Sequence, residues 1–338
     1  MTEKNYGGST SHGFKGGAGV NSSFKKELVK KSKESKEEES GEGIDAKSIK
    51  MYKKAGEIAF KSVDFAREIV KKGVLLREIA EKIEEKIIQL GGKPAFPVNL
   101  SINEIAAHST PSFDDSSVAH GLIKVDIGVH VDGHVADTAF SVDLENYEEN
   151  RKLIKVAEMA LKKASEKAGY DVALNEIGGI IEAEIKLHGF SPIQNLSGHS
   201  IEIYNLHSGV NVPNYDNGSN VKMEEGVYAI EPFSTNGLGA VRDGKLSGIY
   251  HLEEYKNVRD SFAREVLTFI YEEYKTLPFC SRWIHKKFGS RGLLALRQIE
   301  QAGLLHHYAQ LVEKGNGKVA QAENTFIISG KEKIVVVQ

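Results

Sequence analysis

The sequence predicts a mixed α/β fold in which one unit, two helices followed by strands, is used twice. The first observation is an internal repeat: positions 76–94 recur as positions 174–192 at a constant offset of 98, with eight identities among the 19 pairs. The second is that helical periodicity in both copies gives way to short, apolar, strand-like runs. Amphipathic helices resemble one another by chance, but these copies also share their Gly and Pro stops. A duplicated fold of this kind would place a site between its two halves.

Length and composition are those of an ordinary globular protein. The chain has 338 residues, 40% hydrophobic and 27% charged, enough for one large domain or two medium ones. Its net charge of −3 argues against a surface devoted to nucleic acid, so no DNA partner is expected. The single cysteine, Cys280, excludes an intrachain disulfide. No apolar stretch approaches the roughly 20 residues of a membrane span, and residues 1–5 carry no apolar signal. We therefore expect a cytoplasmic protein without a membrane partner.

Residues 1–45 differ in composition from everything after them. They hold eight of the 33 glycines, and their eight lysines and eight acidic residues form a Lys block running into a Glu block. Such a segment cannot bury enough apolar surface to offset its ordering entropy, so we expect a disordered tail before a folded domain at 46–338. One interpretation of the tail is an electrostatic arm for the ribosome or RNA. The other, which we prefer, is a solvated segment.

The folded part is expected to begin with two helices. Residues 46–70 carry one apolar stripe that closes at Gly73, and a second helix from about 76 to 90 is stopped by Gly91-Gly92. The later elements are two strand-like runs and one helical stretch, at 226–232, 324–329 and 259–314, respectively.

Residues 124–142 predict a β-hairpin around Asp132-Gly133, a strong two-residue turn signal. Ideal pairing puts position 128 opposite 137, so Asp126 and Asp137 lie on one face as diagonal neighbours, roughly 7–8 Å apart. Two carboxylates on a half-buried face repel each other unless a cation lies between them. The alternative is that each caps a turn or pairs with a lysine, and the hairpin alone does not decide between the two.

Three later segments add candidate metal ligands. Glu231 ends one apolar strand, Glu323 opens another, and His199 follows the strand start of the second repeat. An acid at the end of a buried strand is costly unless it is ionised against a partner. Two Asp, two Glu and one His form an oxygen-rich set, which suits a pair of divalent ions such as manganese or iron better than a sulfur-seeking zinc.

In five runs of residues the sequence resembles the methionine aminopeptidases of type II, and the resemblance covers essentially all of residues 46–338. The runs are Asn103–Pro111, Val125–Gly128 with Asp137-Thr138, Asn195–His199, Ala229–Pro232 and Gln321–Glu323. The resemblance implies the pita-bread fold, a pseudo-twofold α/β architecture that agrees with the repeat. It also implies a helical insert, at about 246–314 here, which separates type II from type I.

The resemblance further implies a role for each candidate ligand. Asp126 would bind one of two divalent ions (Mn, Fe, Co or Zn). Asp137 and Glu323 would bridge both ions, and His199 and Glu231 would bind the second.

Two histidines are candidates for the chemistry beside the metals. A two-metal site supplies hydroxide near neutral pH, and the resulting oxyanion needs a positioned donor. By resemblance His207 would hydrogen-bond the scissile carbonyl oxygen, and His108 would contact the following amide and assist the leaving group. Glu231 could also carry the proton to the amine. The remaining histidines, His251 among them, are assigned to the scaffold, although ideal alternation puts His130 on the face of Asp126.

The implied substrate is a nascent or newly made chain with a free N-terminal methionine and a small second residue. An apolar pocket is expected for the methionine. By resemblance its lining comprises Phe96, Pro97, Asn99, Leu206 and Tyr308, each of which also has a plain core interpretation. Basic residues of the insert, such as Arg282, suggest nucleic-acid contact as an alternative, but we prefer a role as pocket wall and lid.

Two other functions fit part of this evidence. A proline-specific dipeptidase or aminopeptidase of the same fold would use the same five ligands, but it is not expected to carry the insert or the run around His108. A non-catalytic RNA- or ribosome-binding relative would have degenerate ligands, whereas all five are present here.

Overall fold

The computed structural model describes residues 44–338, so the expected tail lies outside the described residues except for its last two positions. The helices are α2 Ala46–Ile69, α3 Leu76–Gln89, α4 Glu148–Lys167, α5 Leu174–Leu187, α6 Ser261–Glu273 and α7 Ser281–Gln301. The strands of the first half are β1 Lys93–Pro94, β2 Asn99–Ile102, β3 Ile105–Ala107, β4 Leu122–Val131 and β5 His134–Asp143. The later strands are β6 Ser191–Pro192, β7 Ser197–Ile201, β8 Asn211–Pro213, β9 Gly226–Ile230, β10 Phe233–Thr235, β11 Val241–Leu252, β12 Phe279–Cys280, β13 Leu305–Glu313, β14 Val319–Gln321, β15 Asn324–Ser329 and β16 Glu332–Val335. The mixed α/β class is confirmed.

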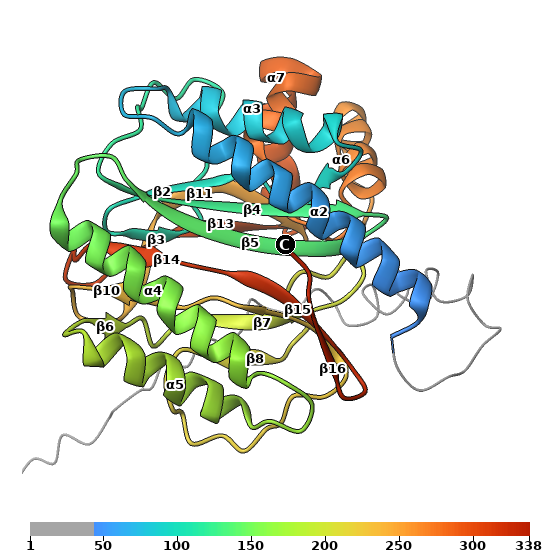
Figure 1. Cartoon of the computed structure of the whole chain (residues 1–338). Coiled ribbons are helices and arrows are strands. Elements are labelled where there is room, and N and C mark those ends of the chain that lie inside the picture. The colour runs from blue at the N-terminus through green and yellow to red at the C-terminus, as the bar shows by residue number, and fades with distance from the viewer. Residues whose placement is uncertain (1–43) are drawn as a thin grey trace, which may run out of the picture.

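The first helix forms where one face of the sequence is apolar and its start is capped. The carboxylate of Asp45 accepts a hydrogen bond from the backbone N–H of Ser48 at 2.9 Å. Ala55, Ile58 and Ala66 of the predicted stripe are buried. This face packs on β4 and β5, the predicted hairpin, as Figure 1 shows.

The predicted duplication is visible in the elements themselves. Both α3 and α5 have 14 residues, and they begin at Leu76 and Leu174, an offset of 98. Gly91 and Gly189 follow the two helices with φ angles of 87° and 79°. This left-handed backbone suits glycine and ends both helices in the same way. The short strands β1 and β6 then start at the same offset.

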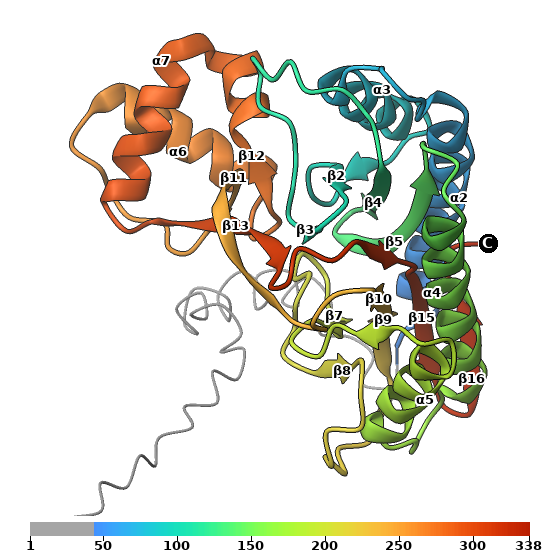
Figure 2. The same ribbon diagram turned by 90° about the vertical axis from the view of Figure 1, so that its left-hand side faces the viewer.

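The strands form several small sheets between these helices. In the first half β4 pairs with β1, β2 and β5, and in the second the order is β16-β15-β9-β7-β8. Two further sheets have the orders β14-β10-β6 and β12-β11-β13-β3. Figure 2 shows α2, α4 and α5 along one side of the strands, with α6 and α7 on the opposite side. No helix among residues 44–338 is long and apolar enough to cross a membrane.

The expectation of helix over residues 259–314 is right for α6 and α7 but wrong for residues 274–280, which hold a turn and β12, and wrong after residue 301. Gly303, with a φ of 72°, ends the last turn, and the chain then enters β13. This segment is a strand because both of its edges find partners: it pairs with β11 on one side and with β3 on the other. The two helices have an apolar core of their own, which includes Val266, Ile270, Ile284 and Leu296.

Candidate metal centre

The β4–β5 hairpin has the predicted register. Val131 pairs with His134, Gly128 with Asp137, and Asp126 with Ala139. The turn needs two residues with positive φ, and Asp132 and Gly133 supply values of 49° and 82°. The alternation of the strands therefore places Asp126 and Asp137 on one face.

The second half brings Glu323, His199 and Glu231 to this hairpin. Glu323 pairs with Ala139 as an isolated bridge, its backbone N–H donating to the carbonyl of Ala139 at 3.0 Å. His199 lies on β7 opposite Ala229 of β9, and Glu231 follows the end of β9 directly. The predicted convergence of segments from both halves is thus present in the structure.

Two threonines fix the position of Asp137 against Glu323. The hydroxyl of Thr325 accepts the backbone N–H of Asp137 and donates to its carbonyl, each at 2.8 Å. The hydroxyl of Thr138 donates to the carbonyl of Glu323 at 2.9 Å. These side chains connect β5 to the segment that runs from β14 into β15, so two ligand-bearing strands are held together without a continuous ladder.

Three side chains meet closely enough to share one ion. Asp137, His199 and Glu323 each offer a ligand atom, and these atoms all lie within 4.8 Å of one another. The His199 Nε2 atom is 3.6 Å from Asp137 Oδ2 and 3.9 Å from Glu231 Oε1. Asp137, His199 and Glu323 are each less than 5% exposed, so the group is closed off from bulk water.

The buried carboxylates of this group repel one another, and a cation between them would stabilise their ionised forms. Burial raises the pKa of Asp126, Glu231 and Glu323 well above the usual range, and repulsion from Asp137 raises each pKa further. Buried Oδ1 atoms of Asp126 and Asp137 have no hydrogen-bond partner among the described residues. Oxygen-rich, buried and unsatisfied donors of this kind fit divalent cations, which favour the ionised carboxylates.

The two candidate histidines lie in different surroundings. The ring of His207 lies 4.4 Å from the ring of His199, centroid to centroid, so it borders the candidate metal ligands. His108 follows β3 with a φ of 57°, and its ring packs edge-on against Tyr308 at 5.2 Å. Burial lowers the pKa of His108 to about 4, which leaves its imidazole neutral at pH 7.

The predicted pocket residues lie around the Asp126 strand, except for Tyr308. Asn99 is the register partner of Asp126 and donates to the carbonyl of Pro97 at 2.9 Å. A Cβ at Gly128 would lie 2.2 Å from the ring of Phe96, so this glycine lets the ring reach the metal-binding face. Leu206 is buried in the same apolar cluster as Phe96.

Tyr308 lies on β13, a strand, and not on the helical part of the insert. Its ring contacts the rings of His108 and His251, which lies 5.3 Å away.

Two residues that the sequence did not single out as site residues border this region. The side-chain amide of Gln321 lies 3.4 Å from both Glu231 and Glu323. Its place two residues before Glu323, at the end of β14, is the signal that could have identified it. His251, which the sequence assigns to the scaffold, is buried against Tyr308, a tertiary contact that no local pattern reveals.

His130 lies at the hairpin tip, where its Nδ1 accepts a hydrogen bond from Gly133 N–H at 3.1 Å. It therefore stabilises the turn and is not among the converging ligands. Arg282 is buried and paired with Glu84, so the alternative interpretation, that this side chain contacts nucleic acid, is wrong.

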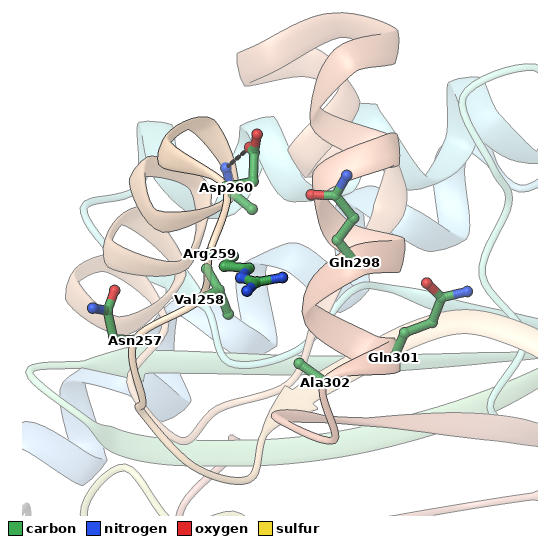
Figure 3. Close-up of a pocket in the computed structure, with 8 residues that line it drawn as sticks. Asn257, Val258, Arg259, Asp260, Gln298, Gln301 and Ala302 are labelled. Atoms are coloured by element: carbon green, nitrogen blue, oxygen red, sulfur yellow. Dashed lines mark hydrogen bonds between the residues drawn. The ribbon is translucent and has the colours of Figure 1, made fainter.

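Two surface cavities lie away from the metal ligands. One, of about 450 Å³, lies between the start of α6 and the end of α7 (Figure 3), where Arg259, Gln298 and Gln301 line it. The other, of about 540 Å³, separates α3 from the insert and is lined by Tyr274, Trp283 and others. Neither cavity contains one of the five ligands or the two candidate catalytic histidines.

Comparison with known proteins gives three results. Residues 50–290 match the sequence model of metallopeptidase family M24. A methionine aminopeptidase from Pyrococcus abyssi is 47% identical over 287 residues, which cover 83% of this chain and 96% of the relative. Among solved structures, a thermophilic Arx1 has a TM-score of 0.74 at 14% identity and covers 87% of this chain and 91% of its own.

A prolidase from Pyrococcus furiosus has a TM-score of 0.57 at 18% identity, over 88% of this chain and 65% of its own. The fold is therefore shared by proteins of different kinds, so the likeness to solved structures shows the fold alone.

Proposed function

The chain belongs to metallopeptidase family M24, and from that premise we propose that it removes N-terminal methionine from peptides and nascent chains at a pair of divalent ions. Its high identity to methionine aminopeptidases makes it a metallo-exopeptidase with the pita-bread fold. The convergence of Asp137, His199 and Glu323 within 4.8 Å is the observation that carries the proposal, because these buried ligands come from both halves of the fold.

Five residues would hold the ions. Asp137 and Glu323 would bridge them, Asp126 would complete one site, and His199 and Glu231 the other. When bound, such ions lower the pKa of a water molecule and polarise the scissile carbonyl. Manganese or iron fits the four carboxylates best, and cobalt and zinc are alternatives for assay.

The remaining steps fall to the protein side chains. His207, which borders His199, donates a hydrogen bond to the scissile carbonyl oxygen and stabilises the negative charge that develops there. His108 is neutral at pH 7 and contacts the amide that follows the scissile bond. Glu231 takes a proton from the attacking water and passes it to the leaving amine.

The methionine side chain would enter the apolar region beside the Asp126 strand. Phe96, Pro97, Asn99 and Leu206 would form its lining, and Tyr308 would close the side of His108. A small second residue is preferred because the closed surroundings of the metal ligands exclude bulk beyond the scissile bond.

Peptide cleavage tests the proposal. We expect the purified protein loaded with Mn²⁺ or Fe²⁺ to convert Met-Ala-Ser to Met and Ala-Ser, and chelation to abolish the reaction. Cleavage of Ala-Pro or Met-Pro dipeptides in preference to Met-Ala-Ser would contradict it and favour the prolidase-like alternative. A protein that binds no divalent ion would instead favour the non-catalytic RNA-binding alternative.

Substrate encounter belongs in the cytoplasm, where new chains emerge, and residues 1–45 are the candidate contact with the ribosome. Their separated Lys and Glu blocks support an electrostatic contact. Cosedimentation with ribosomes at low and high salt, with the whole chain and with residues 44–338, tests this. Equal sedimentation of both proteins would exclude the contact.

A further inference from the structure

A buried ion pair joins the insert to the first half of the fold. The guanidinium of Arg282, at the start of α7, donates to both carboxylate oxygens of Glu84 on α3, at 2.7 and 2.9 Å. The indole N–H of Trp283 donates to the same carboxylate at 2.8 Å. Arg282 is 3% and Glu84 6% exposed. Buried ion pairs often stabilise a fold no better than apolar side chains of similar size. Stability alone therefore does not explain the presence of this pair.

We propose that Arg282 and Glu84 are positioning residues that hold the His108 segment in its active conformation. The proposal rests on the proposed aminopeptidase function and concerns how its chemistry depends on the insert. It follows from the contacts that the pair makes beyond itself.

Each member of the pair binds the backbone of a segment that borders the site. The Nε–H of Arg282 donates to the carbonyl of Pro111 at 3.1 Å, three residues after His108. Glu84 accepts the backbone N–H of Val98 at 3.2 Å, next to Asn99. One rigid unit thus holds both segments at once.

The two segments are also bound to each other. The hydroxyl of Thr110 donates to the carbonyl of Val98 at 2.9 Å, and the N–H of Leu100 donates to the carbonyl of Ser109 at 2.6 Å. The ion pair and these hydrogen bonds therefore hold residues 108–111 against residues 98–100.

His108 needs such support because its backbone is strained. Its φ of 57° is left-handed, a conformation that a side chain other than glycine disfavours. Strained residues persist only where their surroundings over-determine them. Arg282 binds this segment from the insert, and Gln310 of β13 binds it from another direction through Ser109 at 3.0 Å.

Arginine is suited to this position and lysine is not. The planar guanidinium binds both carboxylate oxygens and still directs Nε–H at Pro111, whereas an ammonium cannot span these acceptors. The four hydrogen bonds to Glu84 also leave neither of its oxygens unsatisfied.

The test removes both charges together, since loss of one would leave the other buried and unpaired. We expect Glu84→Leu/Arg282→Met to fold and bind metal normally, but to lose at least about tenfold in kcat on Met-Ala-Ser, because small misplacements of catalytic groups are costly. The single variant Arg282→Lys keeps the positive charge but not the planar guanidinium, so its kcat should also be lower than that of the wild type. The matched control is Lys163→Met/Glu184→Leu, another cation–carboxylate pair with a buried acid, in the second repeat. It should retain wild-type kcat.

A cycle with His108→Ala separates positioning from a general structural role. If the pair acts through His108, the Glu84/Arg282 double substitution should change kcat less than about twofold in the His108→Ala background. Independent losses that add, or an unchanged kcat in the double variant, would overturn the inference. If wild-type protein fails to cleave Met-Ala-Ser, the proposed function fails and the inference with it.

A readout without activity completes the test. In a crystal structure of the double variant, we expect residues 108–111 to be displaced and His108 to leave its left-handed φ. An unchanged segment would refute the positioning role, whatever the activity.

Discussion

At the residue scale, Asp137 is the acid whose charge acts on all four of the other candidate ligands. It lies 3.6 Å from His199, and its charge contributes to the raised pKa of Asp126, Glu231 and Glu323. We expect Asp137→Asn to lower kcat on Met-Ala-Ser at least about 100-fold, because a neutral amide is a poor bridge between two cations. Metal content after gel filtration should fall in parallel. Asp143→Asn, at the end of the same strand, is the control and should keep both. Normal turnover by Asp137→Asn would exclude a bridging role.

The same acids predict how the stability of the metal-free protein depends on pH. An acid whose pKa is raised by folding binds more protons in the folded than in the unfolded state. Stability therefore falls as pH rises above the unfolded pKa of about 4. Burial acts in the opposite direction on His108, whose pKa it lowers to about 4, so the acids are tested against Asp126→Asn/Glu231→Gln/Glu323→Gln, which keeps the histidines. With chelator present, we expect acidification from pH 7 to pH 5.5 to raise the thermal midpoint of the wild type relative to that of this variant. Saturating Mn²⁺ should remove or reverse this trend, since cations pair with the ionised forms. An equal change of the midpoint on acidification in the wild type and in the variant, both in chelator, would contradict the prediction.

At the element scale, the parts that could be predicted are those that local physics determines. Helical periodicity and glycine stops located α3 and α5, and Asp132-Gly133 set the hairpin register to the residue. Local periodicity predicts helix for β13, and this is wrong because its strand character depends on partners far along the chain. The Glu84–Arg282 pair joins residues 198 positions apart, and no spacing reveals it.

The metal ligands lie between these cases. Alternation along the hairpin placed Asp126 and Asp137 together, whereas the roles of His199, Glu231 and Glu323 came from the resemblance to a family. The positions of Glu323 and His199 relative to the hairpin depend on contacts between the two halves, such as the bond from Thr138 to the Glu323 carbonyl.

We expect the contact of Thr325 in β15 with Asp137 in β5 to contribute to the free energy of unfolding and to metal affinity. Thr325→Val keeps the shape of the side chain but leaves the buried N–H and carbonyl of Asp137 without their partner. We expect the free energy of unfolding, measured by urea in the presence of chelator, to fall by about 1–3 kcal/mol. Metal affinity should fall as well, because the backbone of a ligand loses its support. Ser165→Ala, which removes a hydroxyl bonded within helix α4, should cost about 0.5 kcal/mol or less. Equal effects of the two substitutions would show that the contact has no special role.

At the scale of the whole molecule, the candidate metal centre is where the two repeats meet. Asp126 and Asp137 belong to the first hairpin, while the second half supplies His199 from β7, Glu231 from the end of β9 and Glu323 from just before β15. An ion bound there would therefore link the halves as well as supply chemistry. An ion at 100 times its dissociation constant would stabilise the folded state by about 2.7 kcal/mol.

This linkage predicts that metal protects both halves from hydrogen exchange together. On adding Mn²⁺ to metal-free protein, we expect slower exchange in β4 and β5 and also in β7, β9 and β15, because opening either half would break the shared site. The helices α6 and α7 have a separate core and should respond least. Asp137→Asn is the control, in which the ion should change neither half. Protection confined to one half would show that the ligands of the other do not bind the ion.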